Sequence, residues 1–158
     1  MRAAVLAAAL ALGALPAGAG PWFAHPFGEL RAYHGDWLAV CNDLGQGPCR
    51  AVQTPLEPGE TRVGKARLAL ERGPDGGYTI TLSDLGMPEA GPATPRLFVD
   101  GRAAALPAGS WAPGEPGRPA VLHSMAITDP ALVADLLAQM KAGRWLELRH
   151  EGGAVSFS

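Results

Sequence analysis

The chain has 158 residues, which is enough for one domain. Its 13 Lys and Arg against 15 Asp and Glu give a formal net charge of −2, so the sequence offers no basic excess for nucleic-acid binding, which depends on clustered positive charge. Aromatic residues make up only 6% of the chain, while Gly and Pro number 21 and 15, so we expect a modest core and many loops.

The first 19 residues have the pattern of a secretory signal peptide. Arg2 supplies the positive start, Ala3 to Leu15 form an uncharged Ala- and Leu-rich run, and Ala17-Gly18-Ala19 is an A-x-A cleavage site. A transmembrane anchor is the alternative, but the apolar run is shorter than the ~20 residues that a span needs. We therefore predict a periplasmic or secreted bacterial protein with no membrane anchor after cleavage.

Residues 20–35 are aromatic but irregular in pattern, and we expect them to precede a single β-rich domain over residues 36–158. Glu29 to Tyr33 is a candidate for one helical turn. Three aromatic side chains of this segment are candidates for packing onto the sheet: Trp22, Phe23 and Phe27.

The two cysteines, Cys41 and Cys49, lie on either side of the turn-forming segment NDLGQGP. Trp37 to Cys41 and Cys49 to Gln53 read as two strands of a hairpin. A redox pair would need C-x-x-C, and a metal site would need four ligands, whereas none of the four His residues lies at ligand spacing to another. Nearby cysteines of secreted proteins usually pair. We predict a disulfide worth ~2–3 kcal/mol, with a metal site or free thiols as alternatives.

Further alternating segments predict antiparallel strands. They are Lys65 to Arg72, Tyr78 to Leu82, Arg96 to Val99, Arg102 to Leu106, Ala120 to Ile127, Arg144 to Arg149 and Ala154 to Phe157. Asp100-Gly101 is the signature of a tight type I′ hairpin. The last strand reaches Ser158, so we expect either a short edge strand or a truncated one.

One helix is predicted between Asp129, a suitable N-cap, and Gly143, a suitable C-terminal stop, with Pro130 at its first position. Its apolar stripe consists of Leu132, Val133, Leu136, Leu137 and Met140. The sum is a mainly antiparallel β-domain, a β-sandwich or partial barrel with one C-terminal amphipathic helix.

Positive signs of catalysis are absent from the sequence. It has no G-x-S-x-G elbow and no nucleotide-binding, zinc-protease or EF-hand motif. Ser110, Ser124 and His123 exist, but neighbours on a strand, such as His123 and Ser124, point to opposite faces. Two of the carboxylates Asp36, Asp43 and Glu115 could act as an acid–base pair, but solvated charges in loops explain them better. We predict no catalytic residues, metal or cofactor.

Two surfaces could bind a partner. Trp22, Trp111 and Trp145 are candidates for an interface, because exposed aromatic side chains are typical of interfaces. The alternative is that they cap a thin core. The second surface is the edge of the last strand, Ala154 to Ser158, which is apolar and unguarded.

The order of these motifs resembles that of a known family. Tyr33 to Trp37 reads YHGDW, Cys41 is followed by Asn42-Asp43, and the later segments are RLFVDGRAAAL and DPALVADLLAQMKAGRWLEL. Over residues 33–157 the chain is similar to the invasion-associated locus B family and its uncharacterised periplasmic relatives in proteobacteria. The resemblance implies a periplasmic accessory β-domain, linked in some members to host-cell invasion, with no established catalytic residues.

The cysteines refine this resemblance. Cys41 and Cys49 match the family's first cysteine pair, whereas the second pair of many members has no counterpart here, which favours the uncharacterised relatives. We therefore expect a non-enzymatic accessory protein that binds a protein partner. The alternatives are an enzyme inhibitor that plugs a cleft with loop 107–119 and, less favoured, a small hydrolase.

Overall fold

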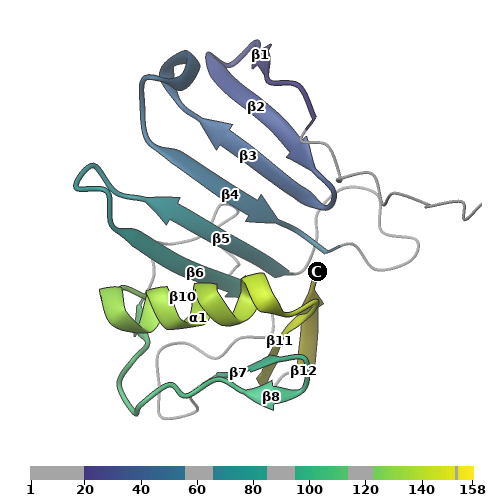
Figure 1. Cartoon of the computed structure of the whole chain (residues 1–158), viewed down its shortest axis with the longest axis vertical. Coiled ribbons are helices and arrows are strands. Elements are labelled where there is room, and N and C mark those ends of the chain that lie inside the picture. The colour runs from purple at the N-terminus through teal and green to yellow at the C-terminus, as the bar shows by residue number, and fades with distance from the viewer. Residues whose placement is uncertain (1–19, 56–65, 85–94, 114–122, 152) are drawn as a thin grey trace, which may run out of the picture.

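The computed structural model describes residues 20–55, 66–84, 95–113, 123–151 and 153–158, so the predicted signal peptide lies outside the described part. The described part of the chain is mainly antiparallel β, with 50% of those residues in strands, two sheets and a single α-helix near the C-terminus (Figure 1). The fold class predicted from the sequence is therefore confirmed.

The larger sheet has eight strands in the order β1-β2-β3-β4-β5-β6-β10-β9. Their bounds are β1 Phe23–His25, β2 Glu29–His34, β3 Trp37–Cys41, β4 Cys49–Gln53, β5 Ala66–Arg72, β6 Tyr78–Asp84, β9 Ala112–Pro113 and β10 His123–Ile127. The first six strands follow one another as an antiparallel meander, and β10 then pairs with β6.

The smaller sheet has four strands in the order β12-β11-β7-β8. Their bounds are β7 Arg96–Val99, β8 Arg102–Ala103, β11 Leu146–His150 and β12 Gly153–Phe157. The helix α1, Pro130–Ala142, crosses the last strands of the larger sheet, with the smaller sheet beside it (Figure 1). The Asp129 carboxylate accepts from the backbone N–H of Ala131 at 2.9 Å and of Leu132 at 3.0 Å, as expected of an N-cap.

The hydrophobic core fills the space between β5, β6 and β10, the helix and the smaller sheet. Its buried members are Ala66, Leu68, Ile80, Leu82, Leu97, Val99, Trp111, Met125, Ile127, Val133, Leu136, Leu146, Leu148 and Phe157. The predicted helix stripe faces this core, because its remaining three residues pack against the same cluster. In the described part of the chain the cluster takes no buried member from β1, β2, β3 or β4.

The prediction for residues 20–35 was wrong. This segment is not irregular, and Glu29 to Tyr33 is not a helical turn, because β1 and β2 form there and extend the larger sheet. Ala32 pairs with Ala39 of β3 and is the one fully buried residue of β2. Trp22, Phe23 and Phe27 are all exposed, and of the three only Phe23 lies in the sheet itself, as the first residue of β1.

The Asp100-Gly101 turn between β7 and β8 has the predicted type I′ conformation, since φ is +48° at Asp100 and +77° at Gly101. The Asp100 carboxylate accepts from the backbone N–H of Arg144 at 3.0 Å and of Trp145 at 3.1 Å. A Cβ at Gly143 would lie 2.6 Å from a methyl carbon of Val99, so glycine is required there. The hairpin thereby fixes the connection from α1 to β11.

Ser158 joins the two sheets. Its carbonyl accepts from Trp37 Nε1 at 2.7 Å, its backbone N–H donates to Gln53 Oε1 at 3.1 Å, and its hydroxyl contacts both Gln53 Nε2 and Asp36 Oδ2. We call these four residues the Ser158 clamp. Figure 1 shows the C-terminal end beside the ends of β4 and β5. The end of β12 is thus held against the larger sheet by directed hydrogen bonds.

Candidate functional site

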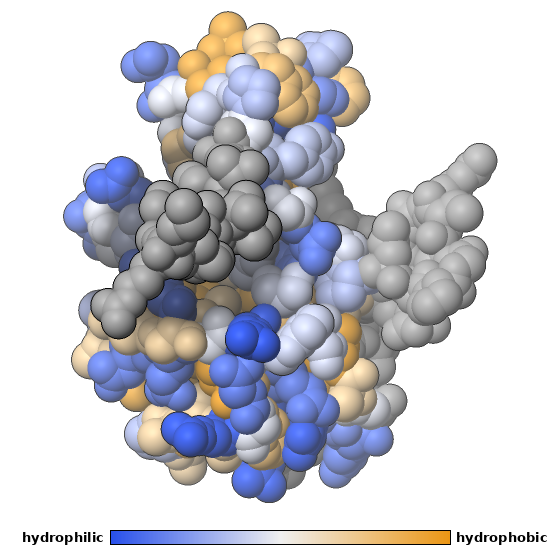
Figure 2. Space-filling model, turned by 45° about the vertical axis from the view of Figure 1, so that its right-hand side comes forward, coloured by the Kyte–Doolittle hydropathy of each residue, from blue (hydrophilic) through white to orange (hydrophobic). Residues whose placement is uncertain are grey.

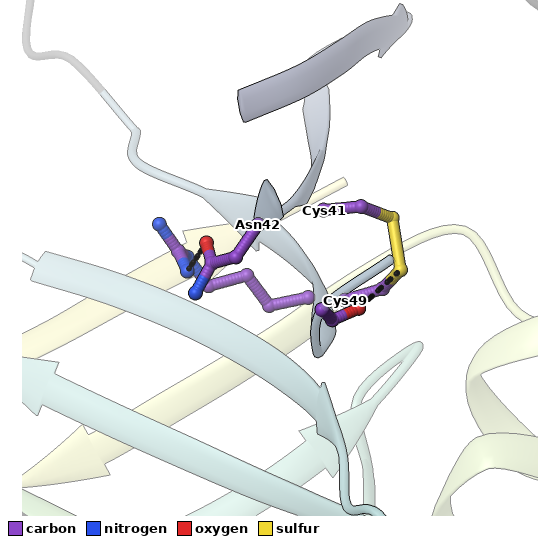
Figure 3. The surroundings of a disulfide bond; sticks show 5 residues. Cys41, Asn42 and Cys49 are labelled. Atoms are coloured by element: carbon purple, nitrogen blue, oxygen red, sulfur yellow. Dashed lines mark hydrogen bonds between the residues drawn. A yellow bond between two sulfur atoms is a disulfide. The ribbon is translucent and has the colours of Figure 1, made fainter. Parts of the chain in front are cut away.

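The predicted disulfide is present. Cys41 and Cys49 are direct partners across β3 and β4, and their sulfur atoms are bonded (Figure 3). The side chain of Arg50 donates to Asn42 Oδ1 at 3.3 Å beside this bond. The bond closes the loop that contains the 3₁₀ turn η1, Asp43–Gly45, whose three residues all have positive φ. An αL conformation at Leu44 is unfavourable for a bulky residue, so the closed loop holds it there.

The three tryptophans predicted as a partner surface do not form one surface. Trp111 is only 9% exposed, belongs to the core, and donates from Nε1 to the Pro95 carbonyl at 3.0 Å. Its assignment to an exposed surface was wrong. Trp22 and Trp145 are 48% and 58% exposed, but they flank β1 and β11, which belong to different sheets. Trp22 therefore shares a surface with residues other than Trp111 and Trp145.

Those neighbours lie around the first hairpin of the larger sheet. Five of the seven large hydrophobic side chains that are exposed in the described part belong to residues 22–44. They are Trp22, Phe23, Phe27, Tyr33 and Leu44, and we call them the aromatic end. Figure 2 shows hydrophobic side chains gathered at the end of the molecule where Figure 1 places β1, β2 and η1. Such a gathering is more informative than scattered exposed residues.

The β1–β2 turn presents Phe27 to solvent. Gly28 has φ +75° and donates from its N–H to the His25 carbonyl at 3.0 Å, which closes the turn His25-Pro26-Phe27-Gly28. Phe27 occupies the tip and is 82% exposed. The ring of His25 meets it edge-on at 4.8 Å. The Pro and Gly spacing is a turn signal, so the exposure of Phe27 could have been predicted from HPFG.

Two contacts make the remainder of the aromatic end a defined surface. Phe23 and Tyr33 lie diagonally across β1 and β2, with ring centroids 6.2 Å apart and ring planes inclined by 18°. The Leu44 N–H donates to the Gly28 carbonyl at 2.9 Å, so η1 is fastened to the β1–β2 turn. The apolar side chains therefore rest on paired strands and a disulfide-closed loop.

A small charge network borders the stacked rings. Glu29 accepts from Arg31 Nε at 2.8 Å and from Arg50 Nη2 at 3.3 Å. The hydrogen bond with Arg31 holds the pKa of Glu29 below its ordinary value; burial opposes this, and the charges of Arg31 and Arg50 lower the pKa further. An apolar centre with a charged, hydrogen-bonded rim is the usual anatomy of a protein interface.

The candidate catalytic residues are not brought together. His123 pairs with Asp84 and Ser124 with Ser83, so His123 and Ser124 occupy successive positions on opposite faces of β10. The Ser110 hydroxyl donates to the Pro107 carbonyl at 2.6 Å. Asp36 accepts from Ser158, Asp43 is exposed in η1, and Glu115 lies outside the described residues. Among the described residues, no group of three or more His, Cys, Asp or Glu could hold a metal ion.

A hollow of about 600 Å³ runs along β7 beside the core. Its described lining consists of Pro95, Arg96, Leu97, Ala103, Ala104, Ala105, Leu106, Pro107, Ala108 and Trp111. Arg96 is the one titratable side chain of that lining, and its guanidinium lies 5.2 Å from the centre of the Phe98 ring. The described walls therefore supply no acid–base pair.

No family model, curated protein or solved structure matches the chain. Within the described residues, no helix is long and apolar enough to span a bilayer. The function is therefore inferred from the geometry of the aromatic end.

Proposed function

We propose that this protein is a non-enzymatic accessory protein of the periplasm or the secreted fraction that binds another protein through the aromatic end. The observation that carries the proposal is the exposure of five large apolar side chains on and around the β1–β2 hairpin and η1, with Phe27 82% exposed at the tip. Exposing such a group to water is unfavourable, and burying aromatic anchors in a partner's pocket is a common source of binding energy.

The disulfide and the signal-like residues 1–19 support the proposed location. Structural disulfides form and persist in oxidising compartments and are rare in the cytosol. The A-x-A pattern at Ala17-Gly18-Ala19 supplies a route to such a compartment.

Kinship with the invasion-associated locus B family remains part of the proposal. It rests on the motifs at Trp37, Cys41 and Cys49, on the Asp100-Gly101 hairpin and on the helix with its following strand. Two of those motifs are in contact, because Asp100 accepts from the backbone that leads from α1 to β11. The hairpin and the helix–strand ending are therefore joined by hydrogen bonds in the fold.

The alternatives receive less support. An inhibitor that plugs a cleft with loop 107–119 would need a protruding side chain there, but Trp111 of this loop is in the core, and residues 114–119 lie outside the described part. A hydrolase using Ser124 and His123 is less supported, because the two are consecutive residues of β10 and consecutive strand positions alternate between the faces of a sheet.

Site-specific crosslinking tests the proposal. A photoreactive phenylalanine analogue is placed at Phe27 and, as a matched control, at Tyr78, which is also an exposed aromatic residue but lies on β6. In cells that secrete the protein, we expect one stoichiometric protein adduct from position 27 and none from position 78. The identified partner should then bind the purified protein, and Phe27→Ser should weaken binding roughly tenfold or more, as for a buried aromatic anchor.

Three results would count against the proposal. They are no adduct at position 27, equal adducts at both positions, or an unchanged affinity of Phe27→Ser for the partner. An adduct with a second copy of this chain would replace the accessory function with self-association, which sedimentation of the purified protein distinguishes directly.

A further inference from the structure

A row of polar side chains lies on the face of the larger sheet that points away from the core. Arg67 of β5 pairs with Ser83 of β6, and Ser83 pairs with Ser124 of β10. Directly paired residues point to the same face, so the three side chains form one cross-strand row. Leu68 and Leu82, their neighbours along the strands, point to the core on the other face.

Two buried atoms of this row have no hydrogen-bond partner in the described structure. They are Nε of Arg67 and Oγ of Ser124. Ser83, which lies between them, is only 6% exposed. Buried polar atoms in folded proteins are nearly always satisfied, and an unsatisfied one commonly indicates a bound water or ion. Because these two atoms lie on either side of Ser83 in one row, a single bound group could satisfy both.

The charge of the row is positive and poorly compensated. Arg50 is already engaged by Glu29, whereas Arg67 forms no ion pair with any described residue. Burial lowers the pKa of the Arg67 guanidinium, the nearby charge of Arg50 lowers it further, and Glu71 offsets part of this. An anion at this place would relieve the unfavourable burial and the repulsion from Arg50 together.

We propose that Arg67, Ser83 and Ser124 form a binding site for an oxyanion group of a ligand, either a carboxylate or a phosphate. The guanidinium donates through Nε and one terminal nitrogen to the anion, as its planar fork favours. The serine hydroxyls donate to the same anion from the neighbouring strands. Strands lie about 4.8 Å apart, and each charge-assisted bond spans about 2.8 Å, so one anion can reach both the arginine head and the serines.

The residues around the row favour a singly charged group. Arg67 carries one charge, and Glu71 lies on the same face of β5 four residues further on. A carboxylate balances that charge, whereas a doubly charged phosphate would leave excess negative charge beside Glu71. A water molecule could fill the space between the two unsatisfied atoms but would not neutralise the arginine.

Anion titration of the full secreted protein tests this site. Sodium acetate and sodium phosphate are added in separate titrations, and sodium chloride at equal ionic strength serves as the blank. Amide chemical shifts are followed by NMR together with the melting temperature. We expect saturable shifts at Ser83 and Ser124 and a rise in melting temperature with at least one oxyanion, and with acetate more than phosphate at equal concentration.

Variants separate a site from general ionic effects. Arg67→Met should weaken anion binding roughly tenfold or more, and Ser124→Ala should weaken it severalfold, as expected from the loss of bonds to a charged group. Arg72→Met is the matched control, because Arg72 is an exposed arginine on the same strand that points to the other face. Phe27→Ser should also bind the anion normally, because the site is separate from the aromatic end.

The proposal is overturned if neither oxyanion gives saturable shifts at Ser83 and Ser124, which would leave water as the occupant of the row. It is equally overturned if Arg72→Met lowers the response as much as Arg67→Met does, since the effect would then be ionic screening. If Arg67→Met does not fold, the wild-type titration and Ser124→Ala decide the question: unchanged binding by Ser124→Ala rejects the site.

Discussion

The molecule has two regions that are stabilised in different ways. In the first, which we call the packed half, β5 to β12 and α1 surround the hydrophobic core. In the second, the hairpin half, β1 to β4 and η1 extend the same sheet beyond the reach of the helix (Figure 1). Polar and covalent links hold the hairpin half: the disulfide, the Glu29 network and the Ser158 clamp. The aromatic end lies entirely in this half.

A single cross-strand row shows how the sequence produces the difference. Ala32, Ala39 and Ala51 are successive partners across β2, β3 and β4. The same row continues with Leu70, Ile80 and Ile127 across β5, β6 and β10. Burial of a larger side chain stabilises more, because the gain is about 25 cal/mol per Å² of apolar surface. The sheet is continuous, but its hydrophobic stabilisation is concentrated in one half.

Removing a core side chain should give the largest effect. Leu148 is 0% exposed on β11, so Leu148→Ala should lower the free energy of unfolding by about 2–5 kcal/mol through lost burial and a cavity. Phe27→Ala removes a larger side chain from the hairpin half, but its exposure limits the loss to about 0.5 kcal/mol. Urea denaturation of both variants measures the contrast. Equal losses would contradict the division into two halves.

Breaking the disulfide should give the second-largest loss of stability. Replacing both Cys41 and Cys49 by Ala should cost about 2–3 kcal/mol, since the unfolded chain then loses its closed ring. The loss should be local. Hydrogen exchange should accelerate first in β2 to β4, while the amides of α1 and β10 keep their protection. Uniform acceleration across the chain would mean that the two halves unfold as one unit.

The Ser158 clamp connects the halves, so weakening it should separate their unfolding. Gln53→Leu keeps the side-chain volume but leaves the Ser158 N–H without its acceptor, which should cost about 1–3 kcal/mol. Gln139→Leu, on the exposed side of α1, is the control and should change stability by less than about 0.5 kcal/mol. A calorimetric trace that broadens or splits only for Gln53→Leu would support the clamp, and identical traces would reject it.

Local signals predicted the elements whose defining residues are close together in the sequence. The bounds of α1 follow from Asp129, Pro130 and Gly143, and the Asp100-Gly101 turn follows from two residues that tolerate positive φ. Strands β3 and β4 also begin and end where the sequence places them. In each case the residues that define the element are close together in the sequence, so no tertiary information is needed.

Other features depend on distant partners. β2 was missed because its one buried residue, Ala32, is small, and Tyr33 beside it is aromatic, so the apolar alternation is weak; its pairing with β3 is what makes it a strand. β9 has two residues and exists through its pairing with β10. Trp111 was misplaced because its neighbours in sequence are the Gly, Ser and Pro residues typical of a surface loop, whereas its burial is set by packing and by the Pro95 carbonyl 16 residues away. The row of Arg67, Ser83 and Ser124 likewise depends on sheet register.

Acid should affect the hairpin half through Glu29, with the smallest effect of the four. The pKa of Glu29 is lowered in the folded state, chiefly by its hydrogen bond with Arg31, so the ionised carboxylate stabilises the fold above its ordinary pKa. That stabilisation is lost as the pH falls below the ordinary Glu pKa of about 4.3 and through the lower folded value. Glu29→Gln should therefore be less stable than wild type at pH 7, and the difference should shrink as the pH is lowered below about 4.

Glu147 is the matched control, because Arg149 lowers its pKa in the same way in the packed half. In both variants, the free energy of unfolding should depend less on pH in the acid range than it does in wild type. Hydrogen exchange at pH 7 distinguishes them, since Glu29→Gln should loosen β2 and β4, which its arginine partners occupy, whereas Glu147→Gln should loosen β11. If Glu147→Gln loosened β2 and β4 to the same degree, the polar network of the hairpin half would not be a local source of stability.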